Sequence, residues 1–200
     1  RGRILDGGCQ WMTAGSGIIH QEMPQPSTRM LGLQLWLNLS AKDKMVTPSY
    51  RDLTAERIPI VKAEGSRVAV ISGVYRDTVG AMKADYVAAT MLDVALEPGA
   101  SVIVPLPPSD TAFAYIIDGS LSVDAVPPRE FLDRRRAVLL SEGEAVSLAA
   151  SESGPARCVL FSGAPLREPV AWGGPIVMNT QDELEMAFRE LADKTFIKGM

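Results

Sequence analysis

Short apolar or alternating runs recur along most of the chain, and alternation with a period of two is typical of β-strands. These runs cover residues 68–71, 91–96, 113–117, 121–123, 137–140, 146–148 and 157–161. Turn residues separate them: Asp118-Gly119 predicts a two-residue hairpin, and Glu142-Gly143 predicts a second reversal. Short strands at this spacing predict an all-β sandwich or barrel.

A strand is also predicted earlier in the chain, at residues 33–39. Leucines at every second position from Leu33 to Leu39 share one face, and the intervening residues share the other. This pattern is typical of a strand packed on a core. Pro48, Pro59 and the charged residues between them then interrupt the pattern, so we expect a connector there.

One helix is predicted near the end of the chain. Thr180 and Glu183 have the spacing of a capping box, in which each side chain accepts a hydrogen bond from the backbone of the other residue. An apolar stripe follows at helical spacing, formed by Leu184, Ala187, Phe188 and Leu191. We expect this helix to dock on the β-structure.

Composition excludes several classes of function. The net charge is −4 and the isoelectric point is about 5.1, so direct nucleic-acid binding is not expected. No apolar run approaches the roughly 20 residues that a membrane span needs, and no signal peptide opens the chain. The two cysteines, Cys9 and Cys158, are too few for a disulfide scaffold, so we expect reduced thiols and an intracellular protein. Because the chain opens on Arg1, we also expect a fragment or processed form of a longer protein.

His20, the only histidine, is the main candidate for chemistry. Glu22 is two positions further along, with only Gln21 between them, so on a short strand after Gly17 both side chains would point to one face. An imidazole and a carboxylate placed in this way suit iron, manganese or zinc. The alternative is a histidine that is hydrogen-bonded or ion-paired in the core. The residues alone identify no further ligand, and no Walker loop, CxxC motif or Ser/His/Asp set is present.

Several ordered stretches resemble the pirin family. They are QWMTAGSGIIHQEMP (10–24), GLQLWLNL (32–39), KMV (44–46), VAVISG (68–73), PLREPV (165–170) and GPIVMNT (174–180). The resemblance implies two double-stranded β-helix (cupin) barrels in tandem. We therefore expect an incomplete N-terminal barrel with a connector (1–63), a complete C-terminal barrel (64–163), and a C-terminal segment with the helix packing back on the barrels (164–200).

The resemblance also implies a single Fe(2+) ion in the first barrel, although other divalent metals are compatible. Family members hold it with a His-x-His pair and a later His-x-Glu pair, which His20 and Glu22 match. Nothing in this chain matches the first pair, and residues 64–163 contain no histidine. We therefore expect metal ligation by His20 and Glu22, a catalytic role for Glu22 as ligand or base, no organic cofactor, and weak metal binding at best.

The resemblance implies a quercetin 2,3-dioxygenase type of activity on a flavonol-like small molecule, although we expect this chain alone to be inactive. An alternative is a redox-sensitive transcription cofactor that acts through a protein partner in the nucleus or cytoplasm. A third reading is a metal-free scaffold. The incomplete barrel would leave Leu5, Ile18, Ile19 and the leucines of 33–39 partly exposed, so self-association through it is also expected.

Overall fold

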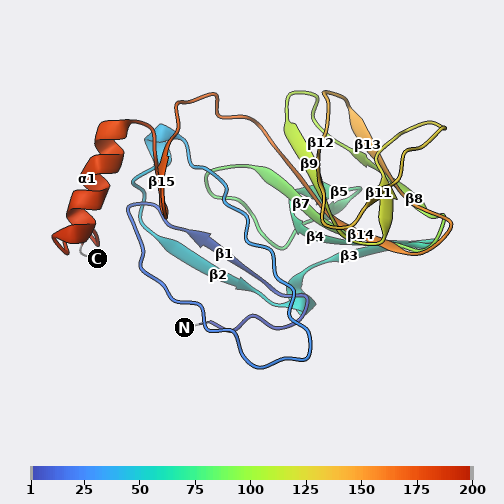
Figure 1. Ribbon diagram of the computed structural model, residues 1–200, viewed down its shortest axis with the longest axis horizontal. Coiled ribbons are helices and arrows are strands. Elements are labelled where there is room, and N and C mark those ends of the chain that lie inside the picture. Colours follow the sequence, from blue (N-terminus) through green and yellow to red (C-terminus); the bar gives the residue numbers. More distant parts are fainter. Residues whose placement is uncertain (1, 199–200) are drawn as a thin grey trace. The chain divides into compact units, whose positions relative to one another are not determined.

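The computed structural model describes residues 2–198, and the chain divides into two compact units (Figure 1). The first unit consists of the chain up to Trp11 together with Asp52–Pro165. The second consists of Met12–Arg51 together with the chain from Leu166 onward. Each unit is therefore built from two stretches that are far apart in the sequence.

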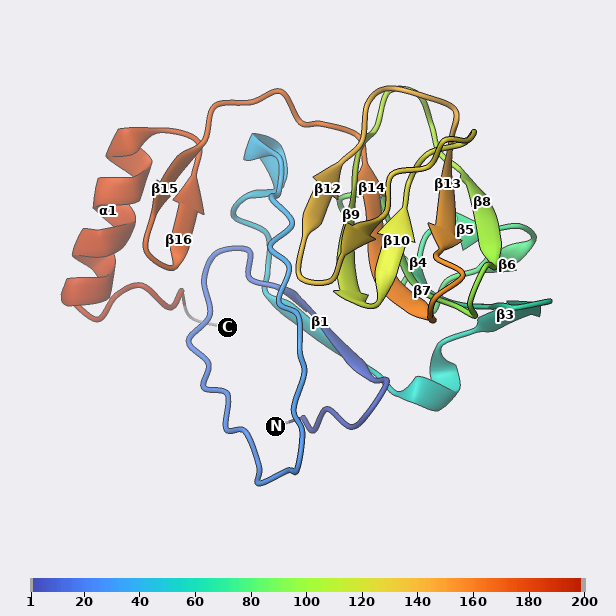
Figure 2. The same cartoon turned by 45° about the vertical axis from the view of Figure 1, so that its right-hand side comes forward.

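Two antiparallel sheets make up most of the β-structure of the first unit (Figure 2). The first has the order β12-β9-β14-β7-β4-β3, with β3 (Ile60–Ala63), β4 (Ser66–Ser72), β7 (Ala89–Leu96), β9 (Thr111–Asp118), β12 (Ala137–Leu139) and β14 (Ala156–Gly163). The second has the order β11-β10-β13-β8, with β8 (Ser101–Pro105), β10 (Ser120–Ser122), β11 (Leu132–Asp133) and β13 (Ala145–Ala150). The strands predicted from the alternating runs are thus confirmed. A small hairpin of β5 (Val74–Tyr75) and β6 (Thr78–Val79) follows β4.

Aliphatic side chains fill the space between the two sheets. Leu92 and Val94 of β7, Ile116 of β9 and Leu148 of β13 are fully buried in one continuous cluster. Inward positions alternate with less buried ones along β7, β8 and β9, as the period of two requires. The interior is therefore a packed core.

The hairpin predicted at Asp118-Gly119 is wrong. β9 pairs with β12 and β14, whereas β10 pairs with β11 and β13, so the chain passes from one sheet to the other at Gly119. The reversal at Glu142-Gly143 likewise joins β12 of the first sheet to β13 of the second. A local turn signal marks where the chain bends, but it does not specify which strand becomes the partner.

A second apolar cluster covers the other face of β4. Ala69 and Ile71, which alternate with the inward-facing valines, pack with Leu53, Ile58 and Met82. Cys9 and Trp11 border this cluster. Burial on both faces explains why residues 68–71 read as a continuous apolar run.

β1 (Cys9–Thr13) and β2 (Ser49–Leu53) pair with each other, and the boundary between the two units falls within both strands. Between them lies the single-turn 3-10 helix η1 (Ala41–Asp43), and η2 (Ala55–Arg57) follows β2.

In the second unit, a hairpin of β15 (Ala171–Gly173) and β16 (Ile176–Met178) packs against α1 (Gln181–Ala192), as Figure 2 shows. The predicted helix and its capping box are confirmed. Leu184 and Ala187 are buried against Ile176, whereas Phe188 and Leu191 remain exposed. Among residues 2–198, no helix is long and apolar enough to cross a membrane.

The strand predicted at residues 33–39 does not form. This stretch has no regular secondary structure, and Leu33, Leu35 and Leu37 are exposed. A strand needs neighbouring strands to pair its backbone groups, and no strand in the described part of the chain pairs with these residues. As expected, Leu5 and Ile19 are also exposed.

Candidate functional site

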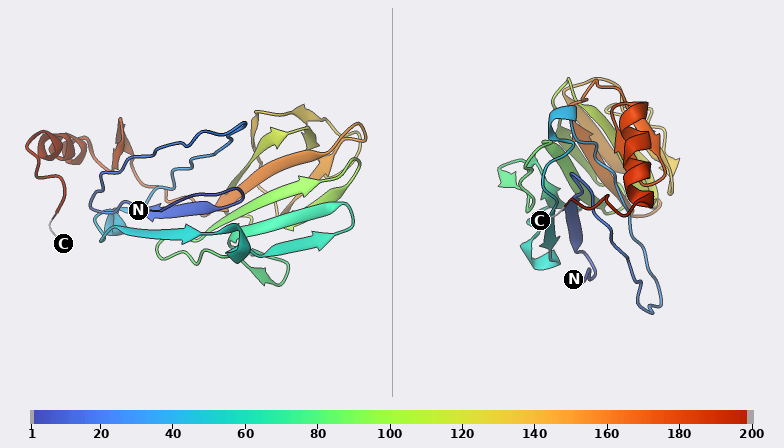
Figure 3. Two further views of the ribbon diagram at one scale, coloured as in Figure 1. Left: turned by 90° about the horizontal axis from the view of Figure 1, so that it is seen from below. Right: turned by 90° about the vertical axis from the view of Figure 1, so that its left-hand side faces the viewer.

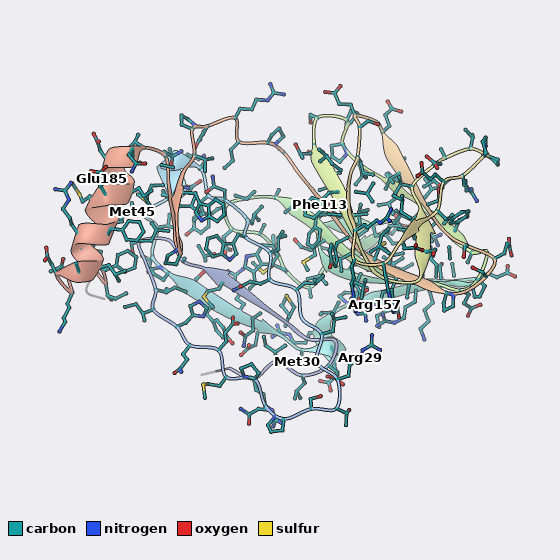
Figure 4. All side chains as sticks on the ribbon, viewed as in Figure 1. Arg29, Met30, Met45, Phe113, Arg157 and Glu185 are labelled. Carbon is teal, nitrogen blue, oxygen red and sulfur yellow. The ribbon has the colours of Figure 1, made fainter. Side chains whose placement is uncertain are left out.

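His20 and Glu22 lie in a long loop, which we call the His20 loop (residues 18–37). The loop has no helix or strand and appears in Figure 3 as an extended blue segment. Both side chains are exposed, as is Met30, which is labelled with Arg29 in Figure 4. The strand expected after Gly17 is therefore absent, and no pleat directs the two side chains to one face. The alternative of a buried core histidine is also wrong.

The N-terminal end of the His20 loop is an ordered turn. The Ser16 amide donates to the Val46 carbonyl oxygen at 2.9 Å, and the Gly17 amide donates to the Ala14 carbonyl oxygen at 2.9 Å. Gly15 has a φ of +50°, and a Cβ there would overlap the Val46 carbonyl oxygen. Glycine at position 15 therefore permits both the positive φ and the close approach of the two backbones.

Gly17 lies close to the aromatic ring of Phe196. Its φ is +125°, and a Cβ built on it would lie 2.6 Å from Cε1 of Phe196. The ring of Phe196 packs with the cluster that joins α1 to the β15–β16 hairpin. Phe196, near the C-terminal end of the chain, therefore lies directly against the residue that precedes the loop.

A buried lysine lies shortly after the C-terminal end of the His20 loop. Lys44 is 7% exposed, and its Nζ donates to Oδ1 of Asn38 at 2.6 Å. Just before it, Ser40 Oγ donates to Oδ2 of Asp43 at 2.7 Å across η1. The polar residues that follow the loop thus form a compact structure around a largely buried lysine.

Glu168 links this structure to the C-terminal stretch. Its Oε2 accepts the Ala41 amide at 2.7 Å and Nδ2 of Asn179 at 3.1 Å. Asn179 Nδ2 also donates to the Pro169 carbonyl oxygen at 3.0 Å. One carboxylate therefore joins η1 to the residues on both sides of the β15–β16 hairpin.

The pKa shifts of Lys44 and Glu183 are consistent with these contacts. Burial lowers the pKa of Lys44, and the nearby carboxylates of Glu168 and Glu183 partly oppose that shift. The pKa of Glu183 is lowered, chiefly because its carboxylate accepts the Thr180 backbone amide. Two acidic groups therefore compensate the charge of one buried amine.

The residues present do not fit a metal ion on their own. Among residues 2–198, no group of three His, Cys, Asp or Glu side chains is arranged to hold one. His20 and Glu22 are two donors, and protein metal sites of this class use at least three protein ligands. Of the two thiols, Cys158 is fully buried, and burial raises its pKa to about 12.

The network around Lys44 and Glu168 is the part of this region that sequence reasoning missed. The stretches containing Lys44, Glu168 and Asn179 were among those that resemble a known family, yet their spacing suggests no chemistry. Their proximity comes from chain folding over more than a hundred residues, which no local pattern reports.

Comparisons with known proteins all point to one family. A family model described as "Pirin C-terminal cupin domain" matches residues 91–197, and the model "Pirin" matches residues 1–37. Human pirin is 39% identical over 188 residues, which cover 93% of this chain and 64% of that protein. The Pseudomonas aeruginosa protein named "Putative quercetin 2,3-dioxygenase" is 41% identical over 199 residues, with coverage of 96% and 69%.

A Thermoplasma acidophilum protein with the same functional name is 34% identical over 219 residues, covering all of this chain and 82% of that protein. Among solved structures, quercetin 2,3-dioxygenase from Acinetobacter baumannii superimposes with a TM-score of 0.80 at 28% identity, covering 97% of this chain and 68% of that one. A Geobacillus kaustophilus protein superimposes with a TM-score of 0.68 at 34% identity, covering 80% and 65%. The chain thus spans about two thirds of the length of most of these relatives.

Proposed function

The chain belongs to the pirin family and has the cupin β-barrel fold with a C-terminal helix, and we propose that it forms part of a pirin-type dioxygenase. The proposed substrate is a flavonol such as quercetin. The observation that carries this proposal is the superposition on the Acinetobacter baumannii quercetin 2,3-dioxygenase, with a TM-score of 0.80 over 97% of the chain. Since the chain covers only part of most relatives, the activity is proposed for the complete encoded polypeptide.

Within this proposal, His20 and Glu22 supply two ligands of an Fe(2+) site. Their side chains are exposed and available, and the loop that carries them begins and ends in ordered structure. The further ligands would come from outside the 200 residues, either from a longer form of the polypeptide or from a second copy. When bound, the metal would supply the means to bring dioxygen and an electron-rich substrate together.

Glu22 has a second role in the proposal. An ionised carboxylate at this position can accept the proton that a flavonol hydroxyl loses when it binds, which is general-base chemistry. Its position two residues from His20 places such a proton acceptor beside the imidazole. His20 has no proton-transfer role in this proposal and acts as a ligand only.

Oxygen uptake and quercetin loss, measured together on the complete polypeptide loaded with Fe(2+), test the activity. We expect turnover above that of free iron, with one dioxygen consumed per quercetin. His20→Ala and Glu22→Gln should each abolish the excess, whereas Glu64→Gln, an exposed glutamate in a turn of the barrel, should not. Turnover no faster than free iron would overturn the dioxygenase proposal.

The same samples separate the alternatives. Iron that is retained through His20 and Glu22 without quercetin loss would favour the redox-sensitive transcription-cofactor role. In that case the set of nuclear proteins captured should differ between the Fe(2+) and Fe(3+) forms. A polypeptide that retains no iron in either form would favour the metal-free scaffold.

A further inference from the structure

We propose that residues 166–198, the C-terminal arm, hold both ends of the His20 loop, with Glu168 and Phe196 as positioning residues. The arm follows the barrel in sequence, yet it belongs to the same compact unit as the loop. Its importance for activity rests on the proposed function, because the loop matters only if His20 and Glu22 take part. Its structural content is independent of that chemistry.

The first contact is at the beginning of the loop. The Phe196 ring lies so close to Gly17 that any side chain at position 17 would collide with it. Gly17 is three residues before His20, and the turn before it is closed by the Ser16 amide and the Val46 carbonyl oxygen. Removing the ring would free the chain on the N-terminal side of His20.

The second contact is at the end of the loop. The Glu168 carboxylate accepts the Ala41 amide at 2.7 Å, a charge-assisted hydrogen bond to the first residue of η1. The same short region contains the Lys44–Asn38 hydrogen bond of 2.6 Å. Because Asn38 directly follows the loop, the position of η1 determines where the loop ends.

The arm can serve both contacts because it is a compact body. Phe196 packs with the cluster formed by Ile176, Leu184 and Ala187, which joins the hairpin to α1. Glu168 is tied to the start of α1 through Asn179, whose backbone amide donates to Glu183 at 3.1 Å. One packed body therefore makes both contacts.

Fixing the two ends of the His20 loop limits its conformational freedom. A segment of this length without internal secondary structure samples many conformations unless its ends are fixed, since closing it costs conformational entropy. Fixing both ends reduces the volume that His20 and Glu22 can explore. We therefore infer that the arm preorganises the segment that carries the candidate ligands.

Amide exchange and the sole histidine signal test the inference on the 200-residue chain. Glu168→Ala should speed exchange of the Ala41 amide about tenfold or more, the effect of losing one charge-assisted hydrogen bond. Phe196→Ala should speed exchange of the Ser16 and Gly17 amides. In both variants the single imidazole resonance, which belongs to His20, should move from its position in the parent chain.

Matched controls make the result specific. Glu185→Ala removes an exposed glutamate of α1, labelled in Figure 4, and Ile197→Ala removes an exposed side chain next to Phe196. Neither should alter exchange at the loop ends. Glu168→Gln keeps one acceptor oxygen, so it should restore most of the protection of Ala41 and return the His20 resonance toward its parent position.

Amides of β7, β9 and β14 report whether the barrel has stayed folded in each variant. If Glu168→Ala unfolds it, the comparison of Glu168→Gln with Asn179→Ala decides, because the second should expose the Ala41 amide and the first should not. Unchanged exchange at Ser16, Gly17 and Ala41, or an unmoved His20 resonance in folded variants, would overturn the inference. Loss of quercetin turnover alone would bear only on the proposed function.

Discussion

The α-carbon of Gly119 lies against the carbonyl oxygen of Pro155, which a Cβ on Gly119 would overlap. At this point the chain leaves β9 in the six-stranded sheet and enters β10 in the four-stranded sheet. The φ of Gly119 is +74°, in the left-handed region that favours glycine. The corner between the two sheets therefore depends on the absence of a side chain at this one position.

Replacing Gly119 with alanine should lower the free energy of unfolding by about 2 kcal/mol or more, because both the backbone conformation and the contact with Pro155 become strained. Urea denaturation followed by tryptophan fluorescence or circular dichroism measures this. Gly154→Ala is the matched control, since nothing lies within 4 Å of a Cβ there. Equal stability of the two variants would contradict the prediction.

Arg157 and Asp93 should be energetically coupled across β14 and β7. Arg157 Nε and Nη2 donate to the two Asp93 oxygens at 2.9 and 2.7 Å, and this pairing raises the pKa of Arg157. Figure 4 labels Arg157. A double-mutant cycle should give a coupling of about 1 kcal/mol, which Arg157→Lys should not reproduce because lysine lacks the planar pair of donors.

The more exposed pair of Arg134 and Asp118 is the control for that cycle. Its single contact is 3.4 Å long, and the two side chains are 60% and 52% exposed. Solvent screens such a pair, so its coupling should be close to zero. Similar values for both pairs would show that geometry and burial do not set the coupling.

The two thiols should differ in reactivity. Burial raises the pKa of both, to about 12 for Cys158, which is fully buried, whereas Cys9 is partly accessible. Because the thiolate is the reactive form, a thiol reagent at pH 8 should modify Cys9 slowly and Cys158 only after unfolding. The folded Cys9→Ser variant should therefore show no labelling. Rapid labelling of this variant would contradict the buried position of Cys158.

Glu183 should make the start of α1 sensitive to acid. Its folded-state pKa lies below its ordinary value, so its stabilising contribution is present above the ordinary pKa and is lost as pH falls through the lower, folded value. The Asn179 and Thr180 amide resonances should report a titration whose midpoint lies below the ordinary pKa of a glutamate side chain. Glu183→Gln should remove this titration, whereas Glu185→Gln should leave it unchanged.

The 200-residue chain should bind well under one metal ion per molecule. Two exposed donors on a loop without regular structure are a poor match for the coordination that iron requires. Elemental analysis after incubation with Fe(2+) and gel filtration measures the occupancy. Stoichiometric iron that is lost in His20→Ala would show that the chain completes the site by another route, such as association of two copies.

Local patterns were sufficient for much of this protein. The period of two in residues 91–96 and 113–117 predicted β7 and β9, because alternate side chains of a strand must face the core. The capping box of Thr180 and Glu183 predicted the start of α1, since both hydrogen bonds lie within one turn. The stretches that resemble the pirin family likewise predicted the family and the cupin fold.

Long-range pairing decided the rest. Gly119 carries the same turn signal whether the next strand pairs with β9 or enters the other sheet. The alternating leucines of residues 33–39 form no strand, because no strand within residues 2–198 pairs with them. Lys44, Glu168 and Asn179 meet only after the chain has passed through the whole barrel. Period and capping are properties of neighbouring residues, whereas sheet membership, the burial of a charge and the contacts that hold the His20 loop depend on partners distant in sequence.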